Sequence, residues 1–379
     1  MAKKAYVGVG GVARKIKKAY IGVDGVARKI KKAYIGVGGV ARPCWSGGEL
    51  TYYGTVEQLA DLWRNHTATT VGDYAVFAGG TGTSNKAFAY NKSLTRIAVD
   101  DMAVSRPNCP AATTVGNYAV IGGGTSVDGR FDIYDTSLTH QVSTFESPVK
   151  RGYLAATTVG NYAAFGGGGA YASSTETNRV DYCDGSLTFG AAKVLRAQRG
   201  GLAATTVGGY ALFAGGSQYS KVVDVYDSSM TQLSRSDYLR AARTNLAATT
   251  VGDYAMFAGG STTSSSESKT VDVFSSSLTR IDTVEDLSNA RAEIMATTLE
   301  GLAMFAGGRD ISSTASKGFD TVDVYDASLV HKTDVHPLSN SRGKGAATTL
   351  GSFAIFVGGY ADSAGSTNVE PKTVDVYTV

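Results

Sequence analysis

Residues 68–80 read Ala-Thr-Thr-Val-Gly-Asp-Tyr-Ala-Val-Phe-Ala-Gly-Gly, and close copies of this stretch recur six more times along the chain. The copies begin at Ala68, Ala112, Ala156, Ala204, Ala248, Ala296 and Ala347, at spacings of 44, 44, 48, 44, 48 and 51 residues. A nearly fixed period of this length is typical of proteins built from repeated structural units. The sequence therefore predicts seven units of one kind.

Each copy predicts two strands joined by a tight turn. A short Ala-Thr-Thr strand is followed by a turn pair such as Gly-Asp or Gly-Asn, and then by a strand of aromatic and small residues. The second strand ends in a glycine pair, for which we expect a structural role. These pairs include Gly79 and Gly80, Gly123 and Gly124, Gly215 and Gly216, and Gly259 and Gly260.

Two further strands complete each unit. Alternating segments such as 223–227 and 322–326 predict a third strand, and Ser-Leu-Thr stretches at 93–95, 137–139 and 277–279 predict a turn leading into a fourth. Four short strands per unit are typical of a propeller blade. We therefore predict an all-β chain with a seven-bladed β-propeller over residues 45–379 and a small β-hairpin repeat arm over residues 1–44.

The chain also predicts how the ring closes. Its last unit ends with a third strand at residues 373–377, and the fourth strand of that blade can come from residues 54–59, before the first repeat. Such a strand would cover the open sheet edge of the last blade.

The repeats resemble the kelch repeat. The resemblance lies in the glycine pair, in the Tyr-Asp that ends the third strand, and in an arginine shortly before each first strand. Five of these arginines lie five residues before their Ala-Thr-Thr segment, and Arg64 and Arg106 lie within a residue of that place. The five are Arg151, Arg199, Arg243, Arg291 and Arg342. The chain departs from kelch repeats in the fourth strand, where Ser-Leu-Thr replaces the usual tryptophan.

The arginines allow two interpretations. They could form a ring of positive charge at the channel mouth, suited to an anion or an acidic sugar. Alternatively, each could satisfy backbone carbonyls between neighbouring blades, as the kelch resemblance implies. The structural interpretation is favoured, since an equivalent residue in most blades is what a repeated structure requires.

The arm has its own period of 14 residues. Each copy places Gly-Gly or Asp-Gly between two valines, which predicts two-residue hairpins with positive φ angles at the turn. In the second copy this pairing sets Ile21 opposite Arg28 and Ala19 opposite Ile30. Residues 1–42 hold eleven Lys or Arg against one acid, Asp24, for a net charge of +10, whereas the remainder carries −7.

This positive charge has several possible partners. It could attract an acidic surface, or it could only keep exposed strand edges from aggregating. Nucleic acid is not expected, because no aromatic residues are interleaved with the lysines in a recognised module.

The tandem Lys-Lys-Ala-Tyr-Ile-Gly-Val units, which end in Ala41-Arg42-Pro43-Cys44-Trp45, resemble the starts of virion proteins from phages and prophages of Gram-positive bacteria. The resemblance implies a phage tail or virion surface protein that is made in the host cytoplasm. Residues 1–44 would dock it to other virion or tail proteins, with several copies on each particle, and the propeller would bind a host cell-surface glycan or protein.

The seven copies also differ from one another on one face. The turns that join first to second and third to fourth strands are nearly constant, whereas the loops on the other face vary. These loops include residues 81–86, 170–179, 261–269, 309–319 and 360–372. We expect binding at the variable face, and the arm to leave from the constant one.

No enzyme motif is evident. The four histidines share no metal-site spacing, and Asp132, Asp181, Asp224, Asp272, Asp323 and Asp375 repeat at one strand position, which favours an architectural role. The three cysteines form no disulfide or zinc pattern. We therefore expect no catalytic residues, no metal and no cofactor.

No apolar run approaches the roughly 20 residues of a membrane span, and no signal peptide is evident. Two other functions stay open: an intracellular kelch-type protein–protein scaffold, and a glycan-active enzyme on a propeller.

Overall fold

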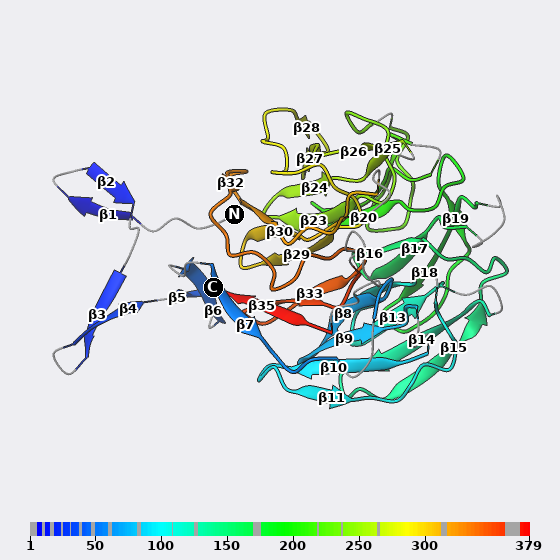
Figure 1. Cartoon of the computed structure of the whole chain (residues 1–379), viewed down its shortest axis with the longest axis horizontal. Helices are drawn as coiled ribbons and strands as arrows, with labels where there is room; N and C mark the ends of the chain where they lie inside the picture. The colour runs from blue at the N-terminus through cyan, green and yellow to red at the C-terminus, as the bar shows by residue number, and fades with distance from the viewer. Residues whose placement is uncertain are drawn as a thin grey trace. The chain divides into compact units, whose positions relative to one another are not determined.

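The computed structural model contains strands and no helix among the residues it describes (Figure 1). The described residues are 6–9, 12–15, 19–23, 26–30, 32–37 and 40–46, as backbone, and 50–59, 63–81, 85–107, 109–124, 128–169, 176–217, 220–235, 238–263, 266–311, 317–360 and 372–379. The chain separates into two compact units, Met1–Thr51 with Val379, and Tyr52–Thr378. This division lies later in the chain than the expected boundary at 44/45.

The first unit contains three antiparallel hairpins. They are β1 (Tyr6–Val9) with β2 (Val12–Lys15), β3 (Ala19–Val23) with β4 (Val26–Ile30), and β5 (Lys32–Val37) with β6 (Val40–Ser46). In the second hairpin Ile21 pairs with Arg28 and Ala19 with Ile30, so the predicted register is confirmed. The predicted Gly-Gly and Asp-Gly turns lie outside the described residues.

The second unit is the seven-bladed propeller that the repeats predict. Blade 1 consists of β8 (Thr67–Val71), β9 (Tyr74–Ala78), β10 (Ala87–Asn91) and β11 (Arg96–Ala98); blade 2 of β12 (Ala111–Val115), β13 (Tyr118–Gly122), β14 (Arg130–Asp135) and β15 (His140–Glu146); and blade 3 of β16 (Ala155–Val159), β17 (Tyr162–Gly166), β18 (Arg179–Asp184) and β19 (Lys193–Val194). Blade 4 has three strands, β20 (Ala203–Val207), β21 (Tyr210–Ala214) and β22 (Val223–Tyr226).

The remaining blades follow the same order. Blade 5 consists of β23 (Ala247–Val251), β24 (Tyr254–Ala258), β27 (Val271–Ser275) and β28 (Arg280–Ile281), with a small hairpin of β25 (Ser261–Thr263) and β26 (Ser266–Glu267) in its variable loop; blade 6 of β29 (Met295–Leu299), β30 (Leu302–Ala306), β31 (Val322–Asp326) and β32 (His331–Lys332); and blade 7 of β33 (Ala346–Leu350), β34 (Phe353–Val357), β35 (Val374–Thr378) and β7 (Thr51–Thr55).

The Ser-Leu-Thr stretches lie in turns that lead into the fourth strands β11, β15 and β28, as predicted. Leu138 has a φ of 64° and Leu278 one of 62°, a region that L side chains seldom adopt. The Leu278 side chain is buried against strands of the neighbouring blade core, so its burial offsets the backbone strain. In blade 4 the predicted fourth strand is reduced to two isolated bridges, which join Tyr226 to Gln232 and Val222 to Tyr238.

The last blade is closed by the N-terminal part of the chain. Strand β7 pairs with β35, and the Val56 and Leu59 amides donate to the carbonyls of Val374 and Lys372. The Tyr52 hydroxyl also donates to Asp375 over 2.6 Å. The closing strand thus exists but spans residues 51–55, slightly earlier than the expected 54–59.

The core is divided among the blade interfaces. Strand-two residues such as Phe77, Phe165 and Phe257 are fully buried, and they pack with small and branched residues of adjacent blades. Separate apolar clusters lie between blades 1 and 2, 2 and 3, 3 and 4, 4 and 5, 5 and 6, and 7 and 1, as expected when a blade packs only against its two neighbours.

A buried histidine in blade 1 makes folding sensitive to acid. Burial lowers the pKa of His66 to about 3, against an ordinary value of 6.5. The folded state therefore resists protonation, and stability is lost as the pH falls from 6.5 towards 3, by about 1.4 kcal/mol per unit. Leucine stands at this position in three blades, at Leu154, Leu202 and Leu246.

We therefore expect His66→Leu to remove this loss. Denaturant unfolding at pH 7.5 and 4.5 measures it: the wild type should lose about 2.5 kcal/mol more than the variant over this interval. Equal losses in both proteins would show that His66 is not the group responsible.

Candidate functional site

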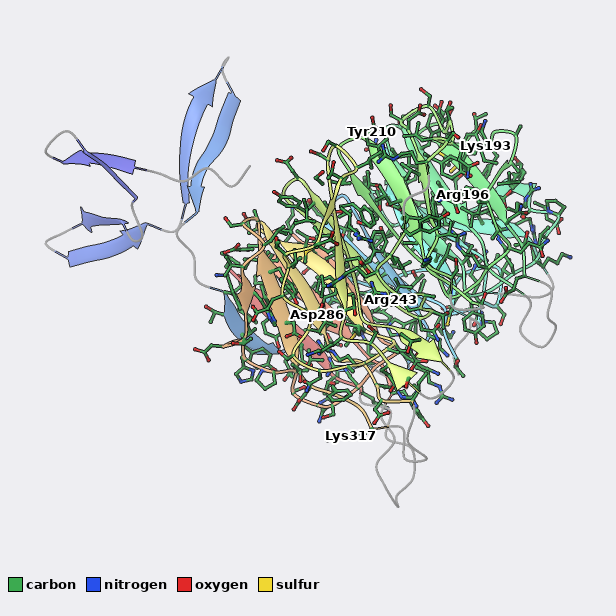
Figure 2. The ribbon with its side chains drawn as sticks, turned by 90° about the horizontal axis from the view of Figure 1, so that it is seen from above. Lys193, Arg196, Tyr210, Arg243, Asp286 and Lys317 are labelled. Carbon is green, nitrogen blue, oxygen red and sulfur yellow. The ribbon has the colours of Figure 1, made fainter. Side chains whose placement is uncertain are left out.

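The five arginines expected at the channel mouth are buried inside the blades, so their interpretation as an exposed charged ring is wrong. Arg199, Arg243, Arg291 and Arg342 are 0% exposed and Arg151 is 3% exposed. Figure 2 shows Arg243 within the body of the propeller, whereas the exposed Lys317 lies at its periphery.

Each of these five arginines, and Arg106 with them, pairs with the repeated aspartate of the blade that follows it in the chain. The pairs are Arg106 with Asp132, Arg151 with Asp181, Arg199 with Asp224, Arg243 with Asp272, Arg291 with Asp323, and Arg342 with Asp375. Apart from Arg243–Asp272, their N–O distances are 2.6–2.8 Å. The aspartates are therefore architectural, as the repeat pattern favours.

Backbone contacts complete each pair. The Arg291 guanidinium also donates to the Phe305 carbonyl of its own blade over 3.2 Å, and the Gly260 amide of the preceding blade donates to the Arg291 carbonyl over 2.9 Å. The Arg291 side chain therefore hydrogen-bonds within its own blade, whereas the Arg291 carbonyl accepts from the preceding blade. The expected hydrogen bond between neighbouring blades is thus made by the main chain and not by the guanidinium. Burial lowers the pKa of Arg243 to about 10, and Asp272 opposes this shift.

Blade 1 replaces the ion pair with an aromatic pair. The carbonyl of Trp63 accepts the Gly359 amide, as the arginine carbonyls do elsewhere, and Phe88 lies opposite Phe77, where the other blades have aspartate. The rings of Trp63 and Phe88 meet edge to face, with their centroids 4.7 Å apart. Trp63, and not Arg64, therefore occupies the arginine position. This replacement can be read from the sequence, since the arginine and the aspartate of the repeat are both absent from blade 1.

The glycine pairs allow the backbones of neighbouring blades to approach closely. Both members have positive φ, for example 65° at Gly259 and 97° at Gly260. A Cβ on Gly259 would lie 2.5 Å from the Arg291 carbonyl oxygen. The pairs at Gly79 and Gly80, Gly123 and Gly124, and Gly215 and Gly216 have the same positive φ. Because each glycine pair lies against the backbone of a neighbouring blade, the same pair is needed in every blade.

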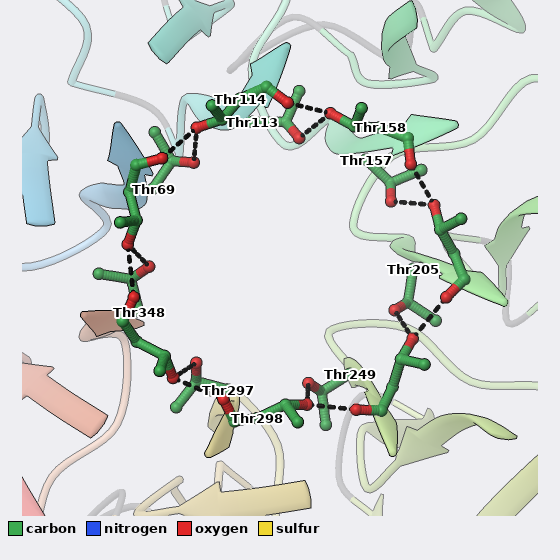
Figure 3. Close-up of a pocket in the computed structure, with 14 residues that line it drawn as sticks. Thr69, Thr113, Thr114, Thr157, Thr158, Thr205, Thr249, Thr297, Thr298 and Thr348 are labelled. Carbon is green, nitrogen blue, oxygen red and sulfur yellow. Dashed lines mark hydrogen bonds between the residues drawn. The ribbon is translucent and has the colours of Figure 1, made fainter. Parts of the chain in front are cut away.

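The first strands line a central cavity of about 470 Å³ with seven pairs of threonines (Figure 3). Thr114 donates to the Thr70 carbonyl over 2.6 Å, and its oxygen lies 2.7 Å from the Thr69 hydroxyl. Because the single Thr114 proton is already donated, Thr69 must be the donor to Thr114. The same arrangement recurs at all seven joints, including Thr70 with Thr348 and Thr349.

Seven equivalent residues surround the start of these strands, each three positions before its Ala-Thr-Thr segment. We call them the mouth ring: Asn65, Cys109, Tyr153, Gly201, Asn245, Glu293 and Lys344. All seven have φ between 46° and 63°. Amide-to-carbonyl bonds of 2.8–3.2 Å link successive members from Cys109 through Lys344 to Asn65.

The mouth ring combines a repeated backbone with different side chains. Glycine is the least strained residue at positive φ, and Gly201 also leaves room for the Thr244 hydroxyl, which a Cβ would approach to 2.5 Å. Tyrosine, glutamate and lysine at this φ each cost about 1 kcal/mol or more. Since strain of this kind tends to be kept where a side chain has a role, the mouth ring is the candidate functional site.

Charge is concentrated on one side of the mouth ring. Arg64 and Arg309 each lie over the ring of Tyr360, 4.5 and 4.6 Å from its centroid. Glu293 accepts from Arg309 over 3.1 Å and lies 3.3 Å from the Lys344 ammonium. We call these five residues, from blades 6, 7 and 1, the cationic arc. Among them three side chains are positive and one is negative.

The repeated arginines do not point to this site. The useful signal lies three residues before each Ala-Thr-Thr segment, where the seven copies agree in spacing and mostly differ in residue type. Several variable loops continue outside the described residues, at 82–84, 170–175, 264–265, 312–316 and 361–371.

Within the described ranges no group of three or more His, Cys, Asp or Glu side chains is placed to hold a metal ion. Burial raises the pKa of the Cys109 and Cys183 thiols to about 12. Nor does this part of the chain contain a helix long and apolar enough to span a bilayer.

Comparison with known proteins shows the fold. No protein-family model matches the chain, and no curated protein does. The solved structure of YjhT is similar over 70% of this chain and 96% of its own, with a TM-score of 0.56 and 12% sequence identity. A likeness at this level of identity supports the propeller architecture alone.

Proposed function

We propose that the chain is a non-enzymatic structural protein of a phage tail or virion surface. Its basic arm anchors it to other particle proteins, and the kelch-like propeller presents a binding surface for a host cell-surface ligand, foremost a glycan. The observation that carries the proposal is the mouth ring, where seven equivalent positions hold mostly different and partly strained side chains. Structure alone would favour one residue at all seven positions, as it does for the threonines.

The arm supports the anchoring half of the proposal. Its hairpins form a unit separate from the propeller, and the net charge of +10 over residues 1–42 differs in sign from the rest of the chain. Two-stranded hairpins are marginally stable alone in water, so a partner surface would stabilise them. A particle protein with an acidic face fits this requirement.

A screen of the full-length protein on isolated host cell-wall glycans tests the proposal. Binding without change in the glycan is the expected result. Glycan cleavage or modification would contradict a non-enzymatic role, and the absence of binding to any glycan would favour an intracellular protein–protein scaffold.

A further inference from the structure

The three hairpins of the arm are equivalent to one another. In each, the strand pairing sets two valines opposite each other beside the turn, then a glycine opposite an alanine, and then an aliphatic residue opposite an arginine. These arginines are Arg14, Arg28 and Arg42. Charge is divided among the copies as well, since residues 3–16 hold four Lys or Arg, residues 17–30 hold four with one acid, and residues 31–44 hold three. Each hairpin therefore repeats the same register and a similar positive charge.

Each hairpin forms a sheet of only two strands. In the described part of the arm, both outer edges of each sheet therefore have no neighbouring strand. Such edges present backbone N–H and C=O groups with which a strand of another protein can pair. Since two-stranded hairpins are marginally stable in water, this pairing would also stabilise the arm. A polypeptide with exposed strand edges therefore suits the arm as a partner.

The charge of the arm indicates the composition of that partner. Pairing between the arms of two copies would bring together two segments that each carry a net charge of +10 over residues 1–42. Repulsion between like charges would oppose this association, whereas an acidic surface would offset the charge and attract the arm. The charge therefore favours an acidic partner over a second copy of the chain.

The repetition of the hairpins indicates that the partner's sites repeat too. Within the propeller, the threonines repeat because the same contact occurs at every joint. A single asymmetric site would place the three hairpins in three different environments and would not require the same residues at the same register in each. Three equivalent sites do require them. Binding at all three would give a tight attachment from individually weak contacts.

The chain length between hairpins limits the distance between these sites. Tyr6 and Lys15 lie opposite each other on neighbouring strands, about 5 Å apart. The five residues from Lys15 to Tyr20, the equivalent of Tyr6, span at most about 17 Å. Successive sites are therefore no more than about 22 Å apart, whereas a globular subunit of about 100 residues has a diameter of about 34 Å. The sites thus lie along a repetitive or fibrous protein, or around a symmetry axis.

We propose that the arm binds, through three equivalent hairpins, an acidic protein surface whose exposed strand edges repeat at intervals of no more than about 22 Å. This inference rests on the proposed anchoring function and defines the chemistry and the repetition of the partner.

The turn glycines supply matched variants that leave the charge unchanged. Gly11→Pro, Gly25→Pro and Gly39→Pro each remove the positive φ that a two-residue hairpin turn requires. The controls replace the same three glycines with asparagine, because asparagine accepts positive φ at such turns. Thermal unfolding of each full-length variant establishes that the propeller is unchanged.

Binding is measured by co-sedimentation of fluorescently labelled full-length protein with purified particles assembled without this chain. The wild type is expected to bind, with an affinity that falls as salt rises. Each single proline variant should bind about tenfold more weakly, with all three factors equal to within about threefold, and any pair of proline changes should cost about a hundredfold. The asparagine variants should bind like the wild type.

Four results would overturn the inference. An effect from one hairpin alone would indicate a single asymmetric site. Equal binding by the proline variants and the wild type would show that charge, and not the hairpin, holds the arm. Self-association of the full-length protein in analytical ultracentrifugation, lost in the proline variants, would make the partner a second copy. These three results leave anchoring to particles standing, whereas a wild type that does not bind particles would contradict anchoring as well.

Discussion

Replacing Arg243 by alanine is expected to lower the free energy of unfolding by about 3–5 kcal/mol, because it leaves the fully buried Asp272 carboxylate without its main counter-charge. The Arg240 backbone N–H would still donate to Asp272, and the Arg240 guanidinium would remain 3.4 Å away. That side chain is 31% exposed and also pairs with Asp286 over 2.8 Å, so it replaces the buried Arg243 contact only in part. Urea unfolding followed by circular dichroism measures the change.

The matched control is Arg280→Ala. Arg280 pairs with Asp282 on the surface, where the two side chains are 38% and 58% exposed. Surface pairs of this kind contribute about 0–1 kcal/mol, so the control should cost little. Comparable losses in both variants would contradict the dominant role of the buried pair.

Blade 1 suggests a sharper version of this experiment. Arg243→Trp and Asp272→Phe should each be strongly destabilising alone, since each leaves the other charge buried. Together they copy the Trp63–Phe88 pair, and the double variant should recover on the order of 2 kcal/mol relative to the sum of the single changes. Simple additivity would show that the aromatic pair depends on other features of blade 1.

Removing residues 1–55 is expected to abolish cooperative folding, whereas removing residues 1–44 should leave a folded propeller. The longer deletion takes away β7, leaves the β35 edge unpaired and removes the hydrogen bond from Tyr52 to Asp375. An exposed strand edge favours association with other chains. Size-exclusion chromatography and thermal unfolding distinguish a folded monomer from an aggregating chain.

A peptide of residues 50–59 added in trans should partly rescue the longer deletion by restoring the missing strand. A folded monomer without the peptide would show that β7 is dispensable. The shorter deletion also tests the arm, since the proposed function predicts that it keeps glycan binding but is missing from purified particles. Finding it on particles would assign attachment to the propeller.

The fold was predictable because every blade repeats the same physical solution. The Thr-Thr pair and the glycine doublet each serve one contact that occurs at each joint, so seven copies report the same constraint. The closing strand was harder to delimit, since β7 has no repeated counterpart before it and begins three residues before Gly54. The positive φ of Leu138 was not predictable, because leucine rarely adopts it and the burial of its side chain is not visible in the sequence.

The candidate site was less predictable for the opposite reason. Arg151 and its equivalents are charged residues at a repeated position, but a charge repeated in six blades forms ion pairs that the fold itself requires. Glu293 and Lys344 are unremarkable in the sequence, and only the shared positive φ and the cationic arc bring them together. Cys109 lies in the mouth ring, yet its raised pKa gives it no reactive character.

The threonine joints have a consequence for the growth of such rings by gene duplication. Each joint consists of one hydroxyl from the earlier blade, one from the later blade and one carbonyl, and no hydroxyl serves two joints. A new blade inserted anywhere would bring a complete set of these groups for its own two neighbours. The hydrogen-bond pattern therefore sets no limit on the number of blades. That number is determined by the wedge shape of the sheets. Such a lineage could gain or lose whole units while every existing joint stays intact.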